Sequence, residues 1–347
     1  MRSGGHFQFT TKATTLAFLA ENLSSAVVCE SIVFSAGGWR TDQRRIISDI
    51  QSNERFGEII VRSSALNEDG FNSSMAGAYT SVLNVDSSST ANLIDAIESV
   101  ITSYGPSAEA ENEVLIQPMI TNVSMSGVIF SHDLNSGSPY YVINYDDQSG
   151  LTDTITSGTT DTERTLLVYR EKVDHIKSAR FKALLLAVQE VESLTPAAGL
   201  DIEFAVTQNE EIYIFQVRPM AVAKKWEPDI AREVSMSLGE IETFVRSRFC
   251  EMPNVLGKQS IFGEMPDWNP AEMIGVVPRD LARTTYEYLI TNSAWAQARA
   301  ELGYRDLSHR PLMVNLGGRV FIDVRESFNS FLPAELGTGT ATKIVKF

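Results

Sequence analysis

The sequence predicts an α+β fold, because helical and strand-like segments are mixed along the chain without the regular alternation of a parallel sheet. Apolar residues at helical spacing predict helices at residues 11–22, 37–52, 87–104 and 177–192. Short apolar and β-branched runs predict strands at residues 26–34, 59–61, 81–85, 114–119, 126–131 and 140–145. The first two thirds of the chain should therefore build sheets covered by helices.

The composition is that of a soluble globular protein with two or three compact units: of 347 residues, 43% are hydrophobic and 21% charged. The formal net charge of -15 argues against a nucleic-acid surface, which needs clustered Lys and Arg, whereas a nucleotide needs only a few local cations. Cys29 and Cys250 are too few for a disulfide framework or a zinc cluster, so we expect a reducing cytoplasm. No secretory signal is expected, and no apolar run approaches the ~18 residues of a membrane span.

The stretch from Ile59 to Val85 has the pattern of a phosphate-binding loop. An apolar run ends at Arg62, two hydroxyls follow at Ser63 and Ser64, and a loop rich in Asn, Asp, Ser and Gly leads to the next strand. Arg62 offers a permanent charge and a planar set of donors, and the loop adds hydroxyl and backbone N–H groups that suit phosphoryl oxygens. The alternative is an ordinary hairpin with a solvated loop and one surface arginine.

Two further segments have an open interpretation. Lys12 lies at the start of the first predicted helix, where a cation opposes the helix dipole. It is either a surface accident or a cation held there for an anion. Residues 150–163, rich in Thr and Gly, are either a mobile loop over a site or a plain connector.

Residues 199–220 predict a β-hairpin with a turn at Gln208 and Asn209. A two-residue turn places Asp201 opposite Gln216 and Glu203 opposite Ile214. Because side chains alternate along a strand, one face then carries the polar residues Asp201, Glu203, Gln216 and Arg218. The other face is expected to be core, formed by Leu200, Ile202, Phe204, Tyr213, Phe215 and Val217.

The polar face of this hairpin suits a magnesium site. Mg²⁺ prefers hard oxygen ligands, takes few of them from protein, and fills its other positions with water and phosphate. Arg218 beside the carboxylates could neutralise charge that develops on a transferring phosphoryl group. The alternative is a surface salt bridge between Arg218 and Asp201 or Glu203.

Four motifs, in this order, resemble the nucleotide-binding module of the phosphoenolpyruvate synthase and pyruvate phosphate dikinase family: VRSSALNED with MAGAYTSVLNV, VLIQPMI, SGVIFSHDLNSG, and DIEF with IYIFQVRPM. The resemblance implies an ATP-grasp fold, in which ATP lies in a cleft between two α+β lobes, followed by a mainly helical linker domain. We therefore expect an N-terminal lobe at residues 1–110, a C-terminal lobe at residues 111–225 and the linker domain at residues 226–347.

The resemblance also implies roles for individual residues. Lys12 and Arg62 are expected to bind phosphate, Gly77 and Ser81 to close over the nucleotide, and Gln117 to lie at the adenine edge. Glu203 and Gln216 are expected to bind Mg²⁺ with Asp201 beside them, and Arg218 to stabilise the transferring phosphoryl group together with Arg62.

Two positions depart from the family pattern. Thr10 and Thr11 replace the glycine pair that usually precedes the lysine, so Lys12 is the least secure assignment. Where the family commonly reads Phe-Thr-Arg-Asp-Pro, residues 130–134 read Phe-Ser-His-Asp-Leu, and any role of that arginine is lost or altered. We interpret His132 as structural, since no second histidine lies near it in sequence.

In the last third, residues 227–248 and 279–302 predict helices, and residues 312–315 and 320–324 predict a hairpin about Gly317 and Gly318. The sequence of this part resembles that of a synthase-like subgroup that contains the bacterial L-glutamine kinase of capsule phosphoramidate synthesis. A set of four residues either lines an acceptor or docking surface or forms the core and rim of a helical linker domain: Trp268, Tyr304, Arg305 and Arg325.

The resemblance implies an ATP- and Mg²⁺-dependent phosphotransferase that passes phosphate through a histidine of a carrier domain to a small acceptor. L-Glutamine or another amide is the expected acceptor, and pyruvate is the runner-up. None of His6, His132, His175 and His309 has the Gly-rich, Ser-His context of that histidine, so we expect a fragment or a carrier domain on another chain. The competing hypothesis is a degenerate module that binds nucleotide as a regulatory ligand or assembly surface, without transfer.

Overall fold

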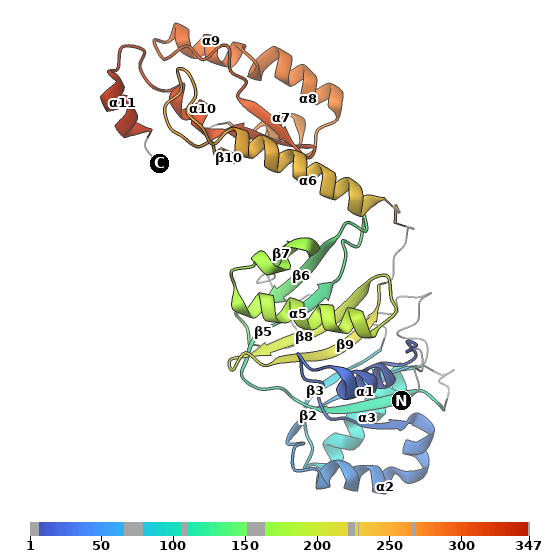
Figure 1. Ribbon diagram of the computed structural model, residues 1–347. Coiled ribbons are helices and arrows are strands. Elements are labelled where there is room, and N and C mark those ends of the chain that lie inside the picture. Colours follow the sequence, from blue (N-terminus) through green and yellow to red (C-terminus); the bar gives the residue numbers. More distant parts are fainter. Residues whose placement is uncertain are drawn as a thin grey trace. The chain divides into compact units, whose positions relative to one another are not determined.

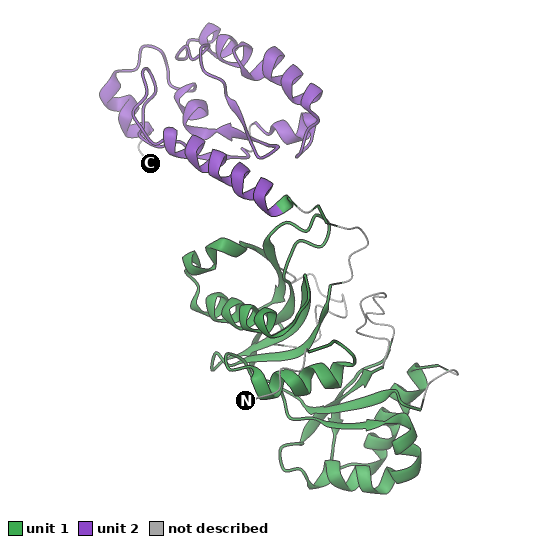
Figure 2. Cartoon of the chain, turned by 45° about the vertical axis from the view of Figure 1, so that its right-hand side comes forward, with its two compact units in different colours: residues 1–230 green, residues 231–347 purple. Residues whose placement is uncertain are grey.

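The computed structural model describes residues 7–65, 79–105, 110–150, 164–220, 226–227, 229–265 and 268–345. The chain divides into two compact units, residues 1–230 and residues 231–347 (Figure 2). Each unit has its own sheet structure and its own hydrophobic core. Unit 1 contains all the residues to which the sequence assigns nucleotide chemistry.

The first lobe of unit 1 is built on a four-stranded antiparallel sheet. Its strand order is β1 (Ile32–Ser35), β4 (Glu113–Pro118), β2 (Glu58–Ser64) and β3 (Val82–Asp86). Helices α2 (Ala36–Ser52) and α3 (Thr90–Ser103) cover one face and share a core with it. The hydroxyl of Ser89 caps α3, as the serine-rich start of this helix predicts.

The expected boundary between the lobes is wrong. A boundary after residue 110 assigns β4 to the second lobe, but β4 pairs with both β1 and β2 in the middle of the first sheet. The first sheet therefore extends to Pro118. Local pattern could not reveal this, because a strand does not specify in its own sequence which sheet it joins.

The second lobe is a five-stranded antiparallel sheet with one long helix on one face (Figure 1). Its strand order is β7 (Arg164–Tyr169), β6 (Tyr140–Asp146), β5 (Val123–Phe130), β8 (Leu200–Thr207) and β9 (Ile212–Pro219). The helix is α5 (Ala179–Leu194), preceded by the short helix η1 (Arg170–His175). Leu184, Leu185 and Val188 of α5 pack against Ile143 and Ile202 in the core of this lobe.

The N-terminal segment joins the two lobes. Helix α1 (Lys12–Asn22) contributes Leu19 to the core of the second lobe, while its Leu16 packs with Leu115 of β4. Val27 then pairs with Tyr213 beside β9, before the chain enters β1 of the first sheet. The strand predicted at residues 26–34 is thus divided between the two sheets.

The β8–β9 hairpin has a different register from the expected one. Its turn is longer, since Val206 pairs with Ile212, and a β-bulge leaves Phe215 without a partner in the ladder. Beyond the bulge, Glu203 pairs directly with Gln216 and Asp201 pairs with Arg218.

The bulge also changes which side chains form the core. Ile212 and Ile214 of β9 are buried in it, whereas Tyr213 and Phe215, predicted there, are only half-buried. A single extra residue reverses the alternation of a strand, so a prediction based on strict period two fails on one side of a bulge. The four polar residues keep a common face because they all lie on the same side of the bulge.

Unit 2 begins with the amphipathic helix α6 (Ile230–Ser247), of which only Ile230 falls in unit 1. It also contains a three-stranded sheet in the order β10 (Phe262–Gly263), β12 (Arg319–Asp323), β11 (Met313–Leu316). Gly317 and Gly318 form the predicted hairpin turn, with φ of 60° and 87°. Its other helical segments are α7 (Pro270–Ile274), α8 (Asp280–Tyr286), the π-helix η2 (Glu287–Thr291), α9 (Ala294–Glu301), α10 (Val324–Asn329) and α11 (Thr338–Ile344).

Candidate functional site

Arg62 is the residue of the first lobe that reaches the second. It lies on β2, on the sheet face opposite to the α2–α3 core, and is only 8% exposed. Its Nη2 donates to Oε2 of Glu203 at 2.6 Å, and its Nη1 donates to the backbone oxygen of Phe215 at 3.0 Å. The basic strand and the acidic hairpin, 141 residues apart in sequence, therefore meet at one place.

The hairpin presents two neighbouring polar pairs on that face. Glu203 is opposite Gln216, which is buried, and Asp201 is opposite Arg218. Nε and Nη2 of Arg218 both donate to Oδ2 of Asp201, at 2.9 and 2.6 Å. The salt bridge considered as an alternative is thus present, but it is largely buried beside Glu203 and is not a surface pair.

The charges around Glu203 keep it ionised. Burial alone would raise its pKa, but the nearby charges of Arg62 and Lys12, together with the hydrogen bond from Arg62, hold the pKa of Glu203 below its usual range. Asp201 behaves differently, since burial outweighs the charge of Arg218 and raises the pKa of its carboxyl group. Glu203 is therefore the carboxylate that is most firmly anionic on this face.

Lys12 is buried at the N-terminus of α1, with 3% of its surface exposed. Thr11 caps the helix by accepting from the backbone N–H of Thr14, and the backbone N–H of Ala13 donates to Oγ of Ser64. A cation buried at the positive end of a helix is unfavourable unless negative charge lies near it, which here is the carboxylate of Glu203. Lys12 is thus no surface accident.

Two residues that support this arrangement were missed from the sequence. Glu113 accepts from the hydroxyls of Thr11 at 2.9 Å and Ser64 at 3.3 Å, which ties α1 to β2 and β4. The hydroxyl of Tyr104 accepts from the backbone N–H of Ser64 and donates to the backbone oxygen of Glu113. Glu113 and Gln117, four residues apart and therefore on one face of a strand, were a signal that β4 shows this face to the site.

Gln117 lies on the same face of β4, opposite Ile60 of β2, and is 2% exposed. Neither its Oε1 nor its Nε2 has a hydrogen-bond partner among the described residues, and the same holds for Nε of Arg62. Leaving a buried amide unpaired costs about 1–3 kcal/mol, so such a group needs a physical reason. A bound molecule with one donor and one acceptor would satisfy it.

The structure gives no support for the predicted roles of Ser81, Gly77 and residues 150–163. Ser81 is exposed directly before β3, and no described contact joins it to Arg62 or Glu203. Gly77 and most of residues 150–163 lie outside the described residues. Cys29, which the sequence did not single out, is buried near Arg62, and burial raises the pKa of its thiol to about 11. That thiol is protonated and is not a nucleophile at neutral pH.

His132 has a structural environment. Its ring packs on Trp226 with 5.2 Å between centroids, and its Nδ1 lies 3.3 Å from Oγ of Ser131. Burial and the charge of Arg170 lower the pKa of His132, which favours the neutral ring. Over the part of the chain that the structure describes, no group of three His, Cys, Asp or Glu residues could hold a metal ion, and no helix is long and apolar enough to cross a membrane.

Residues 43–179 match the family described as pyruvate phosphate dikinase, AMP/ATP-binding domain. This stretch, less than half of the 347 residues, includes Arg62 and Gln117 but neither Lys12 nor the β8–β9 hairpin. No curated protein matches the chain. The two-lobed α+β arrangement predicted from the sequence is confirmed.

Solved structures that resemble this chain include the VanG D-Ala:D-Ser ligase of Enterococcus faecalis, with 14% identity over 64% of this chain and 56% of that one and a TM-score of 0.36. The D-alanine-D-alanine ligase of Helicobacter pylori has 14% identity over 61% and 51%, with a TM-score of 0.35. The D-alanyl-alanine synthetase A of Vibrio cholerae has 15% identity over 60% and 55%, with a TM-score of 0.36. The chain thus spans about half the length of these structures.

Proposed function

We propose that unit 1 binds ATP between the polar faces of its two sheets and donates a phosphoryl group from it. The observation that carries this proposal is the contact between Arg62 and Glu203, because it joins the basic strand of one lobe to the acidic hairpin of the other. The match of residues 43–179 to an AMP/ATP-binding domain supports the choice of ligand. Triphosphate would accept from Arg62 and Lys12, and the base would use the unpaired amide of Gln117.

The residues on the hairpin fit a magnesium ion. Glu203 supplies an ionised carboxylate and Gln216, its ladder partner, an amide oxygen, and both are the hard oxygen ligands that Mg²⁺ prefers. When bound there, Mg²⁺ would neutralise phosphate charge. With a cation on Glu203, Arg62 could donate to a phosphoryl oxygen in place of that carboxylate, because the buried charge of Glu203 would not be left uncompensated.

Arg218 is the group we assign to the transferring phosphoryl group. It is held by two hydrogen bonds to one oxygen of Asp201, so its guanidinium orientation is fixed before any ligand binds. A fixed cation stabilises charge that develops in the transition state without a cost of reorganisation at that moment. Asp201 is a positioning residue in this scheme.

Beyond ATP, the proposal follows the sequence resemblance. The phosphoryl group would pass to a histidine of a carrier domain, in the same parent chain or in trans, and on to a small acceptor, with L-glutamine or another amide preferred over pyruvate. Support comes from the motifs of unit 1, while Trp268, Tyr304 and Arg305 of unit 2 could contribute to recognition of the acceptor. Arg325 is excluded from that surface because it is buried, with 1% exposed.

Calorimetric titration with ATP and Mg²⁺ tests the proposal. We expect saturable binding to the wild type and at least tenfold weaker binding to Arg62→Met and Arg218→Met, since each loses a charged hydrogen-bond donor to phosphate. Arg55→Met is the matched control. Like Arg62, Arg55 pairs with a glutamate, but its partner is Glu30 and the pair lies at the surface. Absence of heat with the wild type, or equal affinity in all four proteins, contradicts the proposal.

A second function is favoured by the histidines themselves, since none has the Gly-rich Ser-His context of a carrier. On that basis unit 1 could bind nucleotide as a regulatory ligand or an assembly surface, without transfer. Mixing the chain with a separately produced carrier domain and ATP labelled on the β-phosphate separates the two functions. Labelled phosphohistidine indicates transfer, and binding without label indicates the regulatory module.

A further inference from the structure

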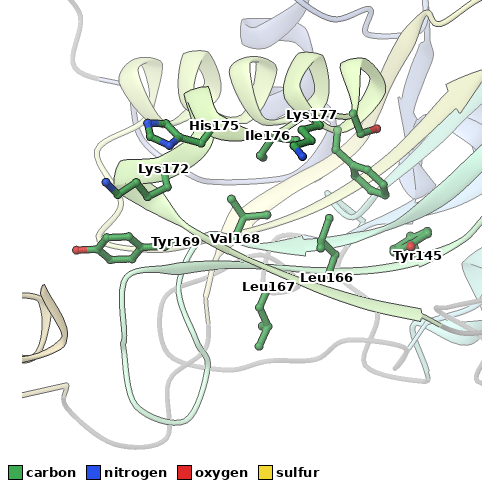
Figure 3. Close-up of a pocket in the computed structure, with 11 residues that line it drawn as sticks. Tyr145, Leu166, Leu167, Val168, Tyr169, Lys172, His175, Ile176 and Lys177 are labelled. Carbon is green, nitrogen blue, oxygen red and sulfur yellow. The ribbon is translucent and has the colours of Figure 1, made fainter. Parts of the chain in front are cut away.

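A groove of about 450 Å³ lies at the β7 edge of the second lobe, between the sheet and helices η1 and α5 (Figure 3). Its floor is apolar, formed by Leu166 and Val168 of β7 with Ile176 and Phe181. The volume is in the range of about 300–1,000 Å³ that small-molecule sites occupy, and an apolar floor is typical of them.

The groove is separate from the proposed nucleotide face. Ladder pairing puts Thr165 and Leu167 of β7 on the same face of the sheet as Asn144 and Glu203. Leu166 and Val168 alternate with these residues and point towards α5, whereas Leu167 points away from it (Figure 3). The groove and the proposed nucleotide site therefore lie on opposite faces of the sheet.

The rim of the groove is basic in a chain that is strongly acidic. Lys172, His175 and Lys177 line it, and Lys172, His175 and Tyr169 gather at one end (Figure 3). The neighbouring cations outside the lining are paired with carboxylates: Arg164 and Arg180 with Asp147, Arg170 with Glu192, and Lys182 with Asp174.

The lining lysines differ from these neighbours. Among the described residues, Lys172 and Lys177 have no carboxylate within ion-pair distance, although the full chain carries 44 acidic against 29 basic residues. Positive charge left uncompensated beside an apolar floor complements a ligand with the opposite charge and an apolar body.

We propose that this groove is a binding site for a small amphipathic anion, a molecule with an apolar body and one carboxylate, sulfonate or phosphate head. The apolar body packs on Leu166, Val168 and Phe181, and the head group lies at the Lys172 and Lys177 rim. The hydroxyl of Tyr169 provides a neutral donor at the Lys172 end of the groove (Figure 3). The site lies outside the face proposed for ATP and needs no nucleotide.

Fluorescence titration with anilinonaphthalene sulfonate, which combines an aromatic body with one anionic head, tests the proposal on the full chain without nucleotide. We expect one saturable site on the wild type, from which octanoate displaces the probe at a much lower concentration than octanol, its uncharged counterpart. Lys172→Met with Lys177→Met should weaken probe binding about tenfold, because two cations are lost near one anion.

A second variant blocks the groove without touching the core. Ser178 lines it, is exposed, and makes no capping hydrogen bond at the start of α5, so Ser178→Trp fills space at little cost to the fold. This variant should lose the saturable site. Lys182→Met is the matched control, since Lys182 follows on α5 but pairs with Asp174 and does not line the groove, and it should bind like the wild type.

Three results would overturn the proposal: no saturable site on the wild type, unchanged binding in both groove variants, or displacement by octanol as effective as by octanoate. Because the titration contains no ATP, its outcome is independent of the nucleotide proposal.

Discussion

Each unit of the protein contains a cluster of buried charges, and the two clusters have similar residues but different partners. In unit 1 the cluster consists of Lys12, Arg62, Asp201, Glu203 and Arg218; we call it the bridging cluster because it joins the two sheets. In unit 2 it consists of Arg310, Asp323, Arg325 and Glu326; we call it the loop cluster.

The arginines show the difference. In the bridging cluster, the shortest hydrogen bonds of Arg62 and Arg218 are to carboxylates, each at 2.6 Å. In the loop cluster, Arg325 donates to the backbone oxygens of Cys250 and Gly257. Arg310 donates to the backbone oxygen of Pro253 at 3.0 Å and, at the longer distance of 3.4 Å, to Oε1 of Glu326. An arginine whose shortest hydrogen bond is to a backbone oxygen fixes a loop, whereas one whose shortest hydrogen bond is to a carboxylate can exchange it for another anion.

The glutamates differ in the same sense. Cations hold the pKa of Glu203 below its usual range, whereas burial and the charge of Asp323 raise the pKa of Glu326 to about 7. Glu203 is thus kept charged and ready to bind a cation, whereas Glu326 changes its protonation state near neutral pH. Residue type alone does not separate a binding cluster from a structural one; the partners do.

The largest effect is expected from Arg62→Met. Removing one partner leaves the carboxylate of Glu203 largely buried without its closest cation, which should lower the free energy of unfolding by about 3 kcal/mol and weaken ATP binding. Chemical denaturation measures the loss. Adding Glu203→Gln should restore most of the stability but not the ATP affinity; recovery of both would show that the pair has no role in binding.

Arg325→Met should act on stability alone. It leaves the backbone oxygens of Cys250 and Gly257 without their donor, so we expect unit 2 to lose about 2–3 kcal/mol of unfolding free energy. ATP affinity, measured by calorimetry at a temperature where the variant is folded, should equal that of the wild type. A tenfold loss of affinity would place unit 2 in nucleotide binding.

Glu326→Gln should remove a pH dependence from unit 2. Since the pKa of Glu326 is about 7 in the folded chain and ordinarily 4.5, the folded state holds a proton that the unfolded chain has released between these values. Stability contributed by this group is therefore lost as pH rises through that window. The variant should be more stable than the wild type by about 1–2 kcal/mol near pH 8 and equal to it near pH 5; thermal melts that stay parallel across this range would refute it.

Gln117→Leu gives the smallest expected change. The amide makes no hydrogen bond within the described residues, so replacing it with an apolar side chain should raise the free energy of unfolding by about 1 kcal/mol, since the cost of burying it unpaired is removed. ATP affinity should fall about tenfold, because a bound base would lose a donor and an acceptor. If ATP affinity is unchanged while stability falls by several kcal/mol, the amide is structural.

The sequence predicted the local pattern of the strands better than the pairing between them. The common face of Glu203, Gln216 and Arg218 could be predicted because strand alternation is a local property, while the roles of these residues and of Arg62 in a nucleotide site stay predictions. The placement of β4 in the first sheet and the bulge at Phe215 could not be found, since both depend on pairing between distant strands.

Two other features of unit 1, the role of Glu113 and the groove beside α5, were not predicted from the sequence. Glu113 was overlooked because its role depends on Thr11, about a hundred residues earlier in the chain. The groove beside α5 was not expected, because Lys172 and Lys177 differ from neighbouring cations only in lacking a carboxylate, which no local pattern shows. A residue whose role depends on its partners in the folded chain therefore could not be recognised from the sequence around it.

Hydrogen–deuterium exchange with and without ATP and Mg²⁺ tests most directly the claim that the bridging cluster, and not the loop cluster, is the binding site. The account predicts slower exchange in β2, β4, β8 and β9 when the nucleotide is present, with no change in β12 and α10. Unchanged exchange throughout unit 1, or protection confined to unit 2, would contradict it.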